Sequence, residues 1–496
     1  MRQATYDALV DRAEEVAARS PARYRAWVGL FAGLGYLVVG FALFLGVILV
    51  AVAIAVCVLG IDTSHINPTL FKFAGLTGVF GAGLTFSVIK GLMGGFPPAA
   101  GTALTRAQAP RLFDEVERLR RAIHVPTLHR IVLSDDFNAA LHQRPRLGLF
   151  GWYHNTLILG LPLLRQFSVD LARAVIAHEL GHLRGEHGRF GARIHRLRLI
   201  WARIAERNDA KLLGGFLRWY APRFNAYSFV MARLQEREAD QVSAELCSAA
   251  AAGAALIRSE VVGRLHARFW DRLDIVAARE AEPPVDLFSR LDRQLAMAPP
   301  EGRRWLGEAL KRGNSREDPH PCLRERLDLI GFVRVGEVPP APVPGTSAAD
   351  QWLEQASGFA SHADARWREA HADQWRAQHA HGAQMLARRD ELAAHSPGDG
   401  GLTLAERWEL ASLIHHFDGA LAARGPLMVV VALAPDHVPA LFRLGADLLT
   451  EDDARGVPLI EAAMFHDPDA IEVCTAVLRD FADRHGQTQP VPPADG

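Results

Sequence analysis

The sequence predicts a mainly α-helical fold with one small β-sheet, and three observations support this prediction. Two apolar runs near the N-terminus are long enough to form membrane-spanning helices. A central stretch, residues 171–188, places two histidines one helical turn apart. A Pro-rich segment further on precedes helical patterns that continue almost to the C-terminus. We therefore expect a transmembrane hairpin, a metal-binding domain with the sheet, and a C-terminal α-helical domain with a repeat-like pattern.

The composition indicates which partners and which redox compartment suit the protein. The 496 residues include 55 basic and 56 acidic side chains, which gives a formal net charge of −1. This balance predicts no nucleic-acid partner. The four cysteines are scattered and none has C-x-x-C spacing, so we expect no disulfide framework and a reducing compartment.

The N-terminal quarter predicts a helix followed by a membrane hairpin. Residues 1–25 form a polar helical pattern that is too long and too acidic for the start of a signal peptide. The hairpin covers residues 26–96, with spans at about 27–59 and 72–93, and its first run has no charge from Ala26 to Ile61. The second run is shorter and rich in glycine, so a buried helix of a soluble domain is an alternative for it.

The charges beside the two runs predict their orientation. Arginines gather before the first run and after the second, whereas the connecting loop holds a single lysine, Lys72. The positive-inside rule then places both termini in the cytoplasm. We expect an integral protein of a bacterial-type inner membrane, with its catalytic and C-terminal parts cytoplasmic and a lipid bilayer as one partner.

Residues 97–335 predict the domain that contains the sheet. An amphipathic helix over 109–123 precedes two short strands at 130–134 and 155–160. A segment with Asn138, Ala139 and Ala140 lies between these strands, and we expect all three segments to pack against the histidine helix. An exposed edge strand there would bind an extended peptide by strand addition; an ordinary covered edge is the alternative.

The histidine helix predicts a metal site. Ser168 is its expected N-cap and Asp170 lies in its first turn, where the helix dipole favours an anion. His178 and His182 are spaced i, i+4 and share one face, so they can bind the same zinc ion. Glu179 points about 100° away from His178 and suits a general base for a metal-activated water.

Two patterns compete for the third metal ligand. The pattern H-E-x-x-H-x-x-G-x-x-H fails because His187 comes one residue too early. A later helical run offers Glu236 and Asp240, which are spaced i, i+4, whereas Glu238 would face away. We expect Glu236 as the ligand and Asp240 as the acceptor that orients a ligand histidine, although a solvated acidic helix face is the alternative for this run alone.

These motifs together resemble the membrane-bound gluzincin peptidases, which include the HtpX-like heat-shock proteases and the Ste-type prenyl-protein peptidases. The resemblance covers roughly residues 100–335 and rests on H-E-L-G-H at 178–182 and E-R-E-A-D at 236–240. The segment at 137–140 and a late segment with His320 and Arg326 are also similar to that family. The resemblance implies a zinc peptidase fold and cleavage of misfolded or surplus membrane proteins.

The C-terminal third predicts helices after a break. Residues 336–347 form a Pro-rich linker, 348–396 a polar helical segment, and 400–488 a helical domain. The sequences around Pro435 and Pro468 are similar, and the distance between them is close to the period of a tetratricopeptide helix pair. Stacks of such helix pairs bind proteins. A generic helical cap is the alternative.

We therefore expect a membrane-anchored zinc endopeptidase with one zinc ion per chain and protein or peptide substrates. Three residues are candidates for stabilising the transition state or occupying the resting site: His320, Arg326 and Tyr227. A second hypothesis is a membrane-bound chaperone or assembly scaffold that acts through its C-terminal module, with a structural zinc site. Processing of prenylated peptides is a third hypothesis, which the sequence favours less because that branch is expected to have many more spans than the two found here.

Overall fold

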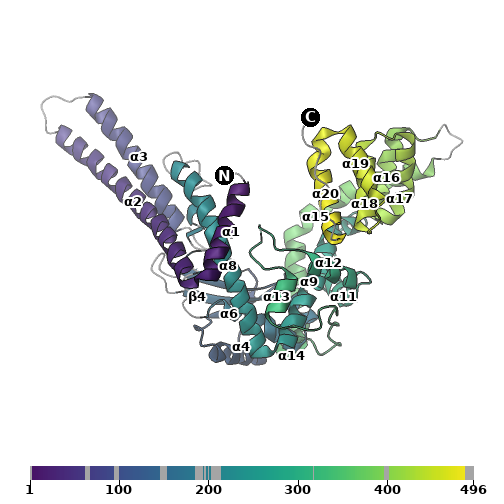
Figure 1. Cartoon of the computed structure of the whole chain (residues 1–496), viewed down its shortest axis with the longest axis horizontal. Helices are drawn as coiled ribbons and strands as arrows, with labels where there is room; N and C mark the ends of the chain where they lie inside the picture. Colours follow the sequence, from purple (N-terminus) through teal and green to yellow (C-terminus); the bar gives the residue numbers. More distant parts are fainter. Residues whose placement is uncertain are drawn as a thin grey trace. The chain divides into compact units, whose positions relative to one another are not determined.

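The computed structural model describes most of the chain. The described residues are 3–61, 68–93, 100–145, 153–184, 191, 194, 197, 198, 200–202, 214–316, 318–395 and 401–485. They divide into two compact units. The first holds residues 1–256, 314–335 and 342–354, and the second holds 257–313, 336–341 and 355–496. The predicted fold class, mainly α-helical with a small sheet, is confirmed (Figure 1).

The first unit begins with α1 (Gln3–Arg19), α2 (Pro21–Ile61) and α3 (Pro68–Met93). Helices α2 and α3 run side by side as a hairpin (Figure 1). They approach closely at two glycines, since a Cβ built on Gly81 would lie 2.7 Å from the carbonyl oxygen of Gly46. Both helices are long and apolar enough to cross a membrane. Many of their large exposed side chains are apolar, among them Leu30, Leu37, Phe41, Phe44, Phe73, Leu76 and Val79, while the exposed charged residues Arg23, Lys72 and Lys90 lie near the helix ends.

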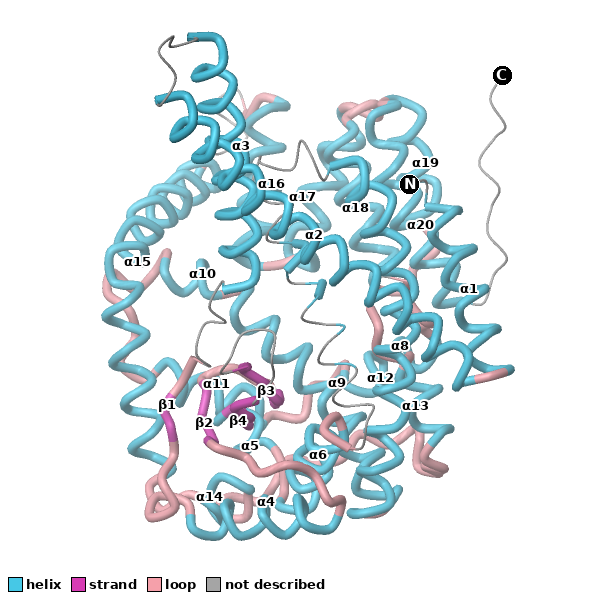
Figure 2. The backbone as a smooth tube through the Cα atoms, turned by 90° about the vertical axis from the view of Figure 1, so that its left-hand side faces the viewer, coloured by secondary structure: helices cyan, strands magenta, loops and turns pink. Residues whose placement is uncertain are grey.

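The small sheet has four strands in the order β1-β2-β4-β3 (Figure 2). They are β1 (Thr102–Ala103), β2 (Arg130–Ser134), β3 (Ala139–Pro145) and β4 (Tyr153–Gly160). The central pair, β2 and β4, is parallel, and the two outer pairs are antiparallel. β3 therefore lies at an edge of the sheet in the described part of the chain, and it begins with the Ala139 and Ala140 of the predicted segment.

Six further helices complete the first unit around the sheet. They are α4 (Pro110–Ala122), α5 (Leu161–Gln166), α6 (Val169–Gly181), α8 (Gly214–Cys247), α13 (Leu323–Leu329) and α14 (Ala348–Trp352). Helix α6 packs against α8, α4 and β3, and α8 also packs against α1 and α2. Helix α8 thus joins the N-terminal helices to the helix that carries the two histidines.

The second unit is entirely helical among its described residues. Helix α9 (Ala249–Asp271) contains the boundary between the units, and α10 (Leu273–Ala277), α11 (Leu287–Ala296) and α12 (Gly302–Lys311) follow it. The long α15 (Ala356–Ala394) packs on α10 and α11, where Trp375 donates from its indole N–H to the carbonyl oxygen of Glu280. Residues 257–313, which the sequence groups with the sheet domain, therefore pack with C-terminal helices.

The predicted C-terminal helices are present as α16 (Leu404–Asp418), α17 (Ala420–Leu433), α18 (Val438–Thr450), α19 (Gly456–His466), η4 (Pro468–Ala470) and α20 (Ile471–His485). Helix α16 begins with a capping box in which Thr403 and Glu406 satisfy each other's backbone N–H. Pro435 and Pro468 each stand three residues before an α-helix, α18 and α20. An α-helix thus begins at the equivalent position after each of the two prolines. A tetratricopeptide array stays a prediction.

Candidate metal centre

Helix α6 positions the two histidines. Ser168 is its N-cap and its side chain accepts a hydrogen bond from the Leu171 N–H, while Asp170 lies in the first turn. The imidazole rings of His178 and His182 lie one turn apart, with centroids 5.0 Å from each other and planes at 90°. Both rings therefore face the same side of α6.

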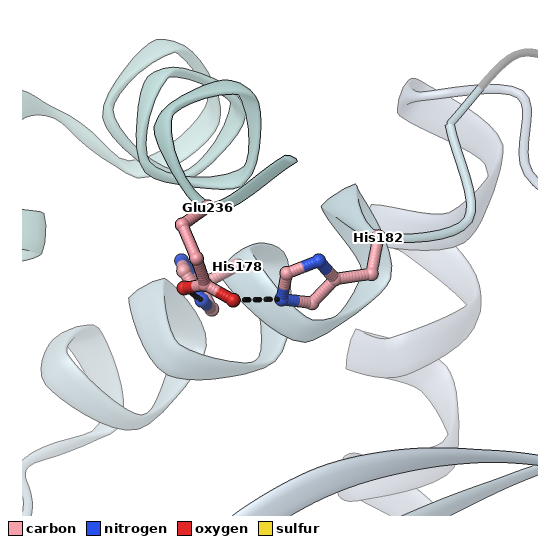
Figure 3. Close-up of side chains that lie close together, drawn as sticks. All are labelled: His178, His182 and Glu236. Atoms are coloured by element: carbon pink, nitrogen blue, oxygen red, sulfur yellow. Dashed lines mark ion pairs between the residues drawn. The ribbon is translucent and has the colours of Figure 1, made fainter. Parts of the chain in front are cut away.

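Helix α8 supplies an acidic group between them. One candidate ligand atom each from His178, His182 and Glu236 lies within 4.8 Å of the other two. The Nε2 atom of His178 is 3.4 Å from one carboxylate oxygen of Glu236, and Nε2 of His182 is 3.5 Å from the other. Figure 3 shows the carboxylate reaching from α8 toward both rings. Glu238 does not belong to this cluster.

The close crossing of α6 and α8 makes this approach possible. A Cβ built on Gly181 would lie 2.9 Å from Cα of Ala239 and 3.4 Å from Cβ of Val242. On the same side of α6, the Ser243 hydroxyl donates to the carbonyl oxygen of Ala174 at 2.7 Å. The glycine inside the histidine motif thus leaves room for α8.

Asp240 orients one of the histidines. One of its carboxylate oxygens lies 3.0 Å from Nδ1 of His178, so the ring donates Nδ1–H and turns Nε2 toward Glu236. Arg326 of α13 donates to both oxygens of Asp240, at 2.8 and 2.7 Å. This bidentate bond holds the carboxylate of Asp240 in place, and that carboxylate in turn orients the imidazole of His178.

The charges of the group are strongly perturbed. Burial opposes ionisation of both carboxylates, but their polar neighbours outweigh it and lower the pKa of Glu236 and of Asp240 to about 2. Burial also lowers the pKa of His178, yet its bond to Asp240 and the nearby Glu236 raise that pKa to about 9. Burial and the charge of His178 lower the pKa of His182 to about 4.

Glu179 lies beside this cluster on α6. Burial raises the pKa of its carboxyl group to about 7, while the backbone N–H of Leu141 on β3 donates to it and acts in the opposite direction. The carboxyl group therefore changes charge near neutral pH, which suits a group that accepts and returns a proton. Its contact with Leu141 also places it at the strand that begins with Ala139 and Ala140.

The residues fit a divalent metal ion. The Oε2 atom of Glu236 is buried and has no hydrogen-bond partner among the described residues, although its pKa keeps it ionised. Its nearest nitrogens, Nε2 of His178 at 3.4 Å and a nitrogen of Arg326 at 3.9 Å, are too distant or misaligned for a hydrogen bond, and a bound cation would satisfy such a buried anionic oxygen. Two imidazoles and one carboxylate are also the donor set of catalytic zinc sites, which keep a further position open.

A comparison with known families agrees with this geometry. Residues 106–330 match the sequence profile of peptidase family M48. This segment of the chain belongs to peptidase family M48. The predicted resemblance is thereby confirmed, and membership indicates a metallopeptidase. No curated protein and no solved structure matched the chain.

Two of the three remaining candidates lie next to the metal cluster of the M48 segment. His320 is half exposed, with Nε2 3.7 Å from Glu236 and Nδ1 2.6 Å from Asp318. Arg326 is buried and held by Asp240, with its nearest nitrogen 3.9 Å from Glu236. His320 thus has a ring nitrogen on the accessible side of the cluster, and Arg326 lies behind it.

The structure does not bring Tyr227 into this group. Its ring packs against Trp27 and Phe31, with centroid distances of 4.4 and 5.2 Å, and its backbone carbonyl accepts a hydrogen bond from Tyr24. It stands nine residues before Glu236 on the same helix, a rise of about 13 Å. Tyr227 therefore belongs to the apolar contact between α8 and the N-terminal helices.

Asn138 also makes structural contacts. Its carbonyl oxygen accepts from the Gly160 N–H at 2.7 Å, which fixes the start of β3 on β4. Residues 185–190, which include His187 of the rejected ligand pattern, lie outside the described residues.

Sequence reasoning missed three groups around the M48 site. Asp318 holds the ring of His320, and its position two residues earlier is a signal that the spacing could have given. Asn314 accepts from the Cys322 N–H and donates to Glu325, so it closes the loop that carries His320. The third is the Leu141 N–H, which has no side-chain signal in the sequence.

Proposed function

We propose that this chain is a membrane-anchored zinc endopeptidase that hydrolyses peptide bonds of misfolded or membrane proteins on the cytoplasmic side. The observation that carries the proposal is the cluster of one donor atom each from His178, His182 and Glu236 within 4.8 Å of one another, with Glu179 alongside on the same helix. A metal site joined to a proton-transfer group is the minimal apparatus of peptide hydrolysis. A closed structural site would need no such group.

The ligands of the ion would be His178, His182 and Glu236. When bound, zinc would supply a Lewis acid that makes water a nucleophile near neutral pH and polarises a carbonyl group. Asp240 keeps the Nδ1–H of His178 occupied, so that Nε2 is the nitrogen left for the ion. Arg326 neutralises Asp240 and holds it in place.

Glu179 would transfer the proton. Its carboxylate takes a proton from the attacking water and passes it to the nitrogen of the departing amine, which completes hydrolysis without a net change in the residue. A pKa raised to about 7 makes both halves of this transfer easy near neutral pH. The positions of the two histidines and of Glu179 on one helix turn keep the distances short.

The edge of the sheet is the proposed binding place for the substrate backbone. Among the described residues β3 pairs with β4 alone, and the Leu141 N–H points to Glu179 instead of to β4. An extended peptide that added to this edge at 139–141 would pass directly beside Glu179. We further propose that the ring of His320, held at Nδ1 by Asp318, places Nε2 where it can stabilise the oxygen that becomes negative during attack.

The hairpin of α2 and α3 supports the anchoring. Leu30 is 75% exposed and Phe73 70% exposed, and the exposed charged residues of these helices, Arg23, Lys72 and Lys90, lie near the helix ends. Such exposure of apolar side chains is unfavourable in water and ordinary in lipid. The arginines at 2–25 and 106–121 support a cytoplasmic location for both ends of the hairpin.

The deciding experiment is proteolysis by the purified full-length chain in lipid nanodiscs, with and without zinc. Casein and an unfolded membrane protein serve as substrates. Cleavage should require zinc, and Glu179→Gln should lower its rate by about 10² to 10⁴ while zinc content stays the same. Glu238→Gln is the matched control, because that acid does not belong to the cluster. Equal cleavage by wild type and Glu179→Gln would contradict the proposed role.

A scaffold function is the second candidate, because the C-terminal unit exposes a long apolar helix face on α17. The two hypotheses differ in cells that lack the wild-type gene. If catalysis is the main function, Glu179→Gln should fail to complement. If the module is the main function, Glu179→Gln should complement and substitutions on the exposed face of α17 should not.

A further inference from the structure

Helix α17 presents an uncovered apolar stripe. Besides Ala422, its exposed residues recur at the spacing i, i+4, i+7, i+8, i+11 and i+12, and all are apolar or glycine: Leu421, Gly425, Met428, Val429, Ala432 and Leu433. Leu421 is 74% exposed, Leu433 60% and Met428 57%. This spacing marks one continuous face of a helix. Its size and composition are typical of an interaction surface rather than of an ordinary solvated helix.

The opposite face of α17 is fully engaged. Ala423, Leu427 and Val430 are buried in a core with α16 and α18, and Figure 1 shows these helices together. Arg424, the charged residue of α17, forms an ion pair with Glu451 and lies off the stripe. The stripe is therefore held on a rigid support, and Gly425 has nothing within 4 Å that would prevent a backbone from approaching.

Charge decides what kind of partner suits this surface. Residues 401–485 contain 14 acidic and six basic side chains, a net charge of −8, which leaves +7 on the rest of a chain whose total is −1. Asp418 precedes α17 and Glu451 lies beside it, but these two acids pair with Arg389 and Arg424; Asp436 follows α17 at the other end of the stripe. The surroundings of the apolar face thus favour positive charge.

Two other occupants fit this charge poorly. A second copy would bring the same −8 against itself, and in an antiparallel helix pair Asp418 would approach Asp436 of the other copy. A bilayer surface with anionic lipids would also repel an acidic module. An apolar helix with basic flanks meets both the stripe and its border.

We propose that the exposed face of α17 is a docking site for an amphipathic helix that carries lysine or arginine beside its apolar face. Apolar side chains of the partner pack on Leu421, Met428 and Leu433, and its basic side chains face Asp436 and the net negative charge of residues 401–485. Binding of the partner helix at this site does not require any step of the peptidase reaction. The test of this site and the test of the proposed function can therefore fail independently of each other.

The test measures binding of a fluorescent synthetic helix of about four turns. One version has leucines on one face and lysines on its flanks, and the second has glutamates in place of the lysines. The full-length Glu179→Gln protein in nanodiscs of neutral lipid is titrated, so no peptide is cleaved. The lysine version should bind at least about tenfold more tightly than the glutamate version, and added salt should weaken it.

Variants locate the site. Leu421→Gln and Met428→Gln together should weaken binding by at least about tenfold. Val285→Gln is the matched control, since Val285 is 68% exposed in the same unit and lies off the stripe. Circular dichroism verifies folding, and Leu433→Gln replaces the pair if that variant misfolds.

Four results would overturn the proposal. The first is equal binding of the lysine and glutamate helices, and the second is binding that the stripe variants leave unchanged. The third is a wild-type mass in solution that doubles with concentration and stays single in the stripe variant, which would assign the face to a second copy. If neither helix binds even at salt concentrations near zero, the proposal is also rejected.

Discussion

Gly181→Ala tests whether the crossing of α6 and α8 sets the geometry of the metal site. The new Cβ would lie 2.9 Å from Cα of Ala239 and 3.3 Å from its Cβ. Carbon atoms in contact normally stay about 3.5–4.0 Å apart, so the helices must separate by roughly half an ångström or more. The histidines stand on α6 and Glu236 on α8, so this separation pulls the ligand set apart.

Opposing effects set the expected magnitude. Overpacking of this kind costs about 1–3 kcal/mol, while alanine is favoured over glycine in a helix by about 0.5–1 kcal/mol. The net loss of stability should therefore be about 0–2 kcal/mol, which leaves the protein folded. Misplaced ligands should cost more in function, and we expect about 10- to 100-fold weaker zinc binding.

The assay pairs thermal unfolding of the metal-free protein with zinc affinity from competition with a chelating dye. Gly307→Ala in α12 is the control, because a Cβ there meets nothing within 4 Å. It should keep its zinc affinity and gain up to about 1 kcal/mol. If Gly181→Ala behaves like Gly307→Ala in both measurements, the helices are not in close contact at this crossing and the reasoning is refuted. Adding Ala239→Gly should restore only part of the affinity, since Cα of residue 239 remains.

Three other predictions follow from the site and the hairpin. Glu236→Ala should lose zinc in elemental analysis and Glu238→Ala should keep it, and the reverse result would show that the ligand assignment is wrong. Zinc affinity in the Glu179→Gln background should rise about tenfold per pH unit from pH 6 to 8, because His178, with its pKa raised to about 9, must lose a proton to bind; an affinity independent of pH would refute this. Reporter fusions after Gly101 and at Gly496 should report the cytoplasm and one near Ser64 the opposite side, whereas a C-terminal reporter on the far side would exclude the hairpin orientation.

Local rules predicted much of the site. The spacing of His178 and His182 fixes their shared face by helical geometry alone, and the same arithmetic separates Glu236 from Glu238. The strand over 130–134 was readable because its apolar residues are bounded by polar and Pro-containing turns. Gly181 has no side chain, so it permits a close approach by another helix. This feature could be predicted without knowing which helix that would be.

Other features depend on contacts between distant segments. Helices over 257–313 continue the apolar pattern of the preceding helices, so nothing in their sequence indicates that they pack with α15 in the second unit. The position of Tyr227 depends on where α1 and α2 meet α8, which a helical pattern does not specify. The backbone N–H that reaches Glu179 comes from β3, and backbone groups carry no sequence signal at all.

The charges of the centre explain why the same residues can exist with and without a metal ion. Glu236 and Asp240 are buried anions, and Arg326 supplies only one positive charge against them. The proton on His178 supplies the second, which is why its pKa lies well above that of an exposed imidazole. A divalent cation at Nε2 would replace this proton and also satisfy the undonated oxygen of Glu236. The metal-free centre is thus balanced by Arg326 and the proton on His178, and loss of that proton on binding couples metal occupancy to pH.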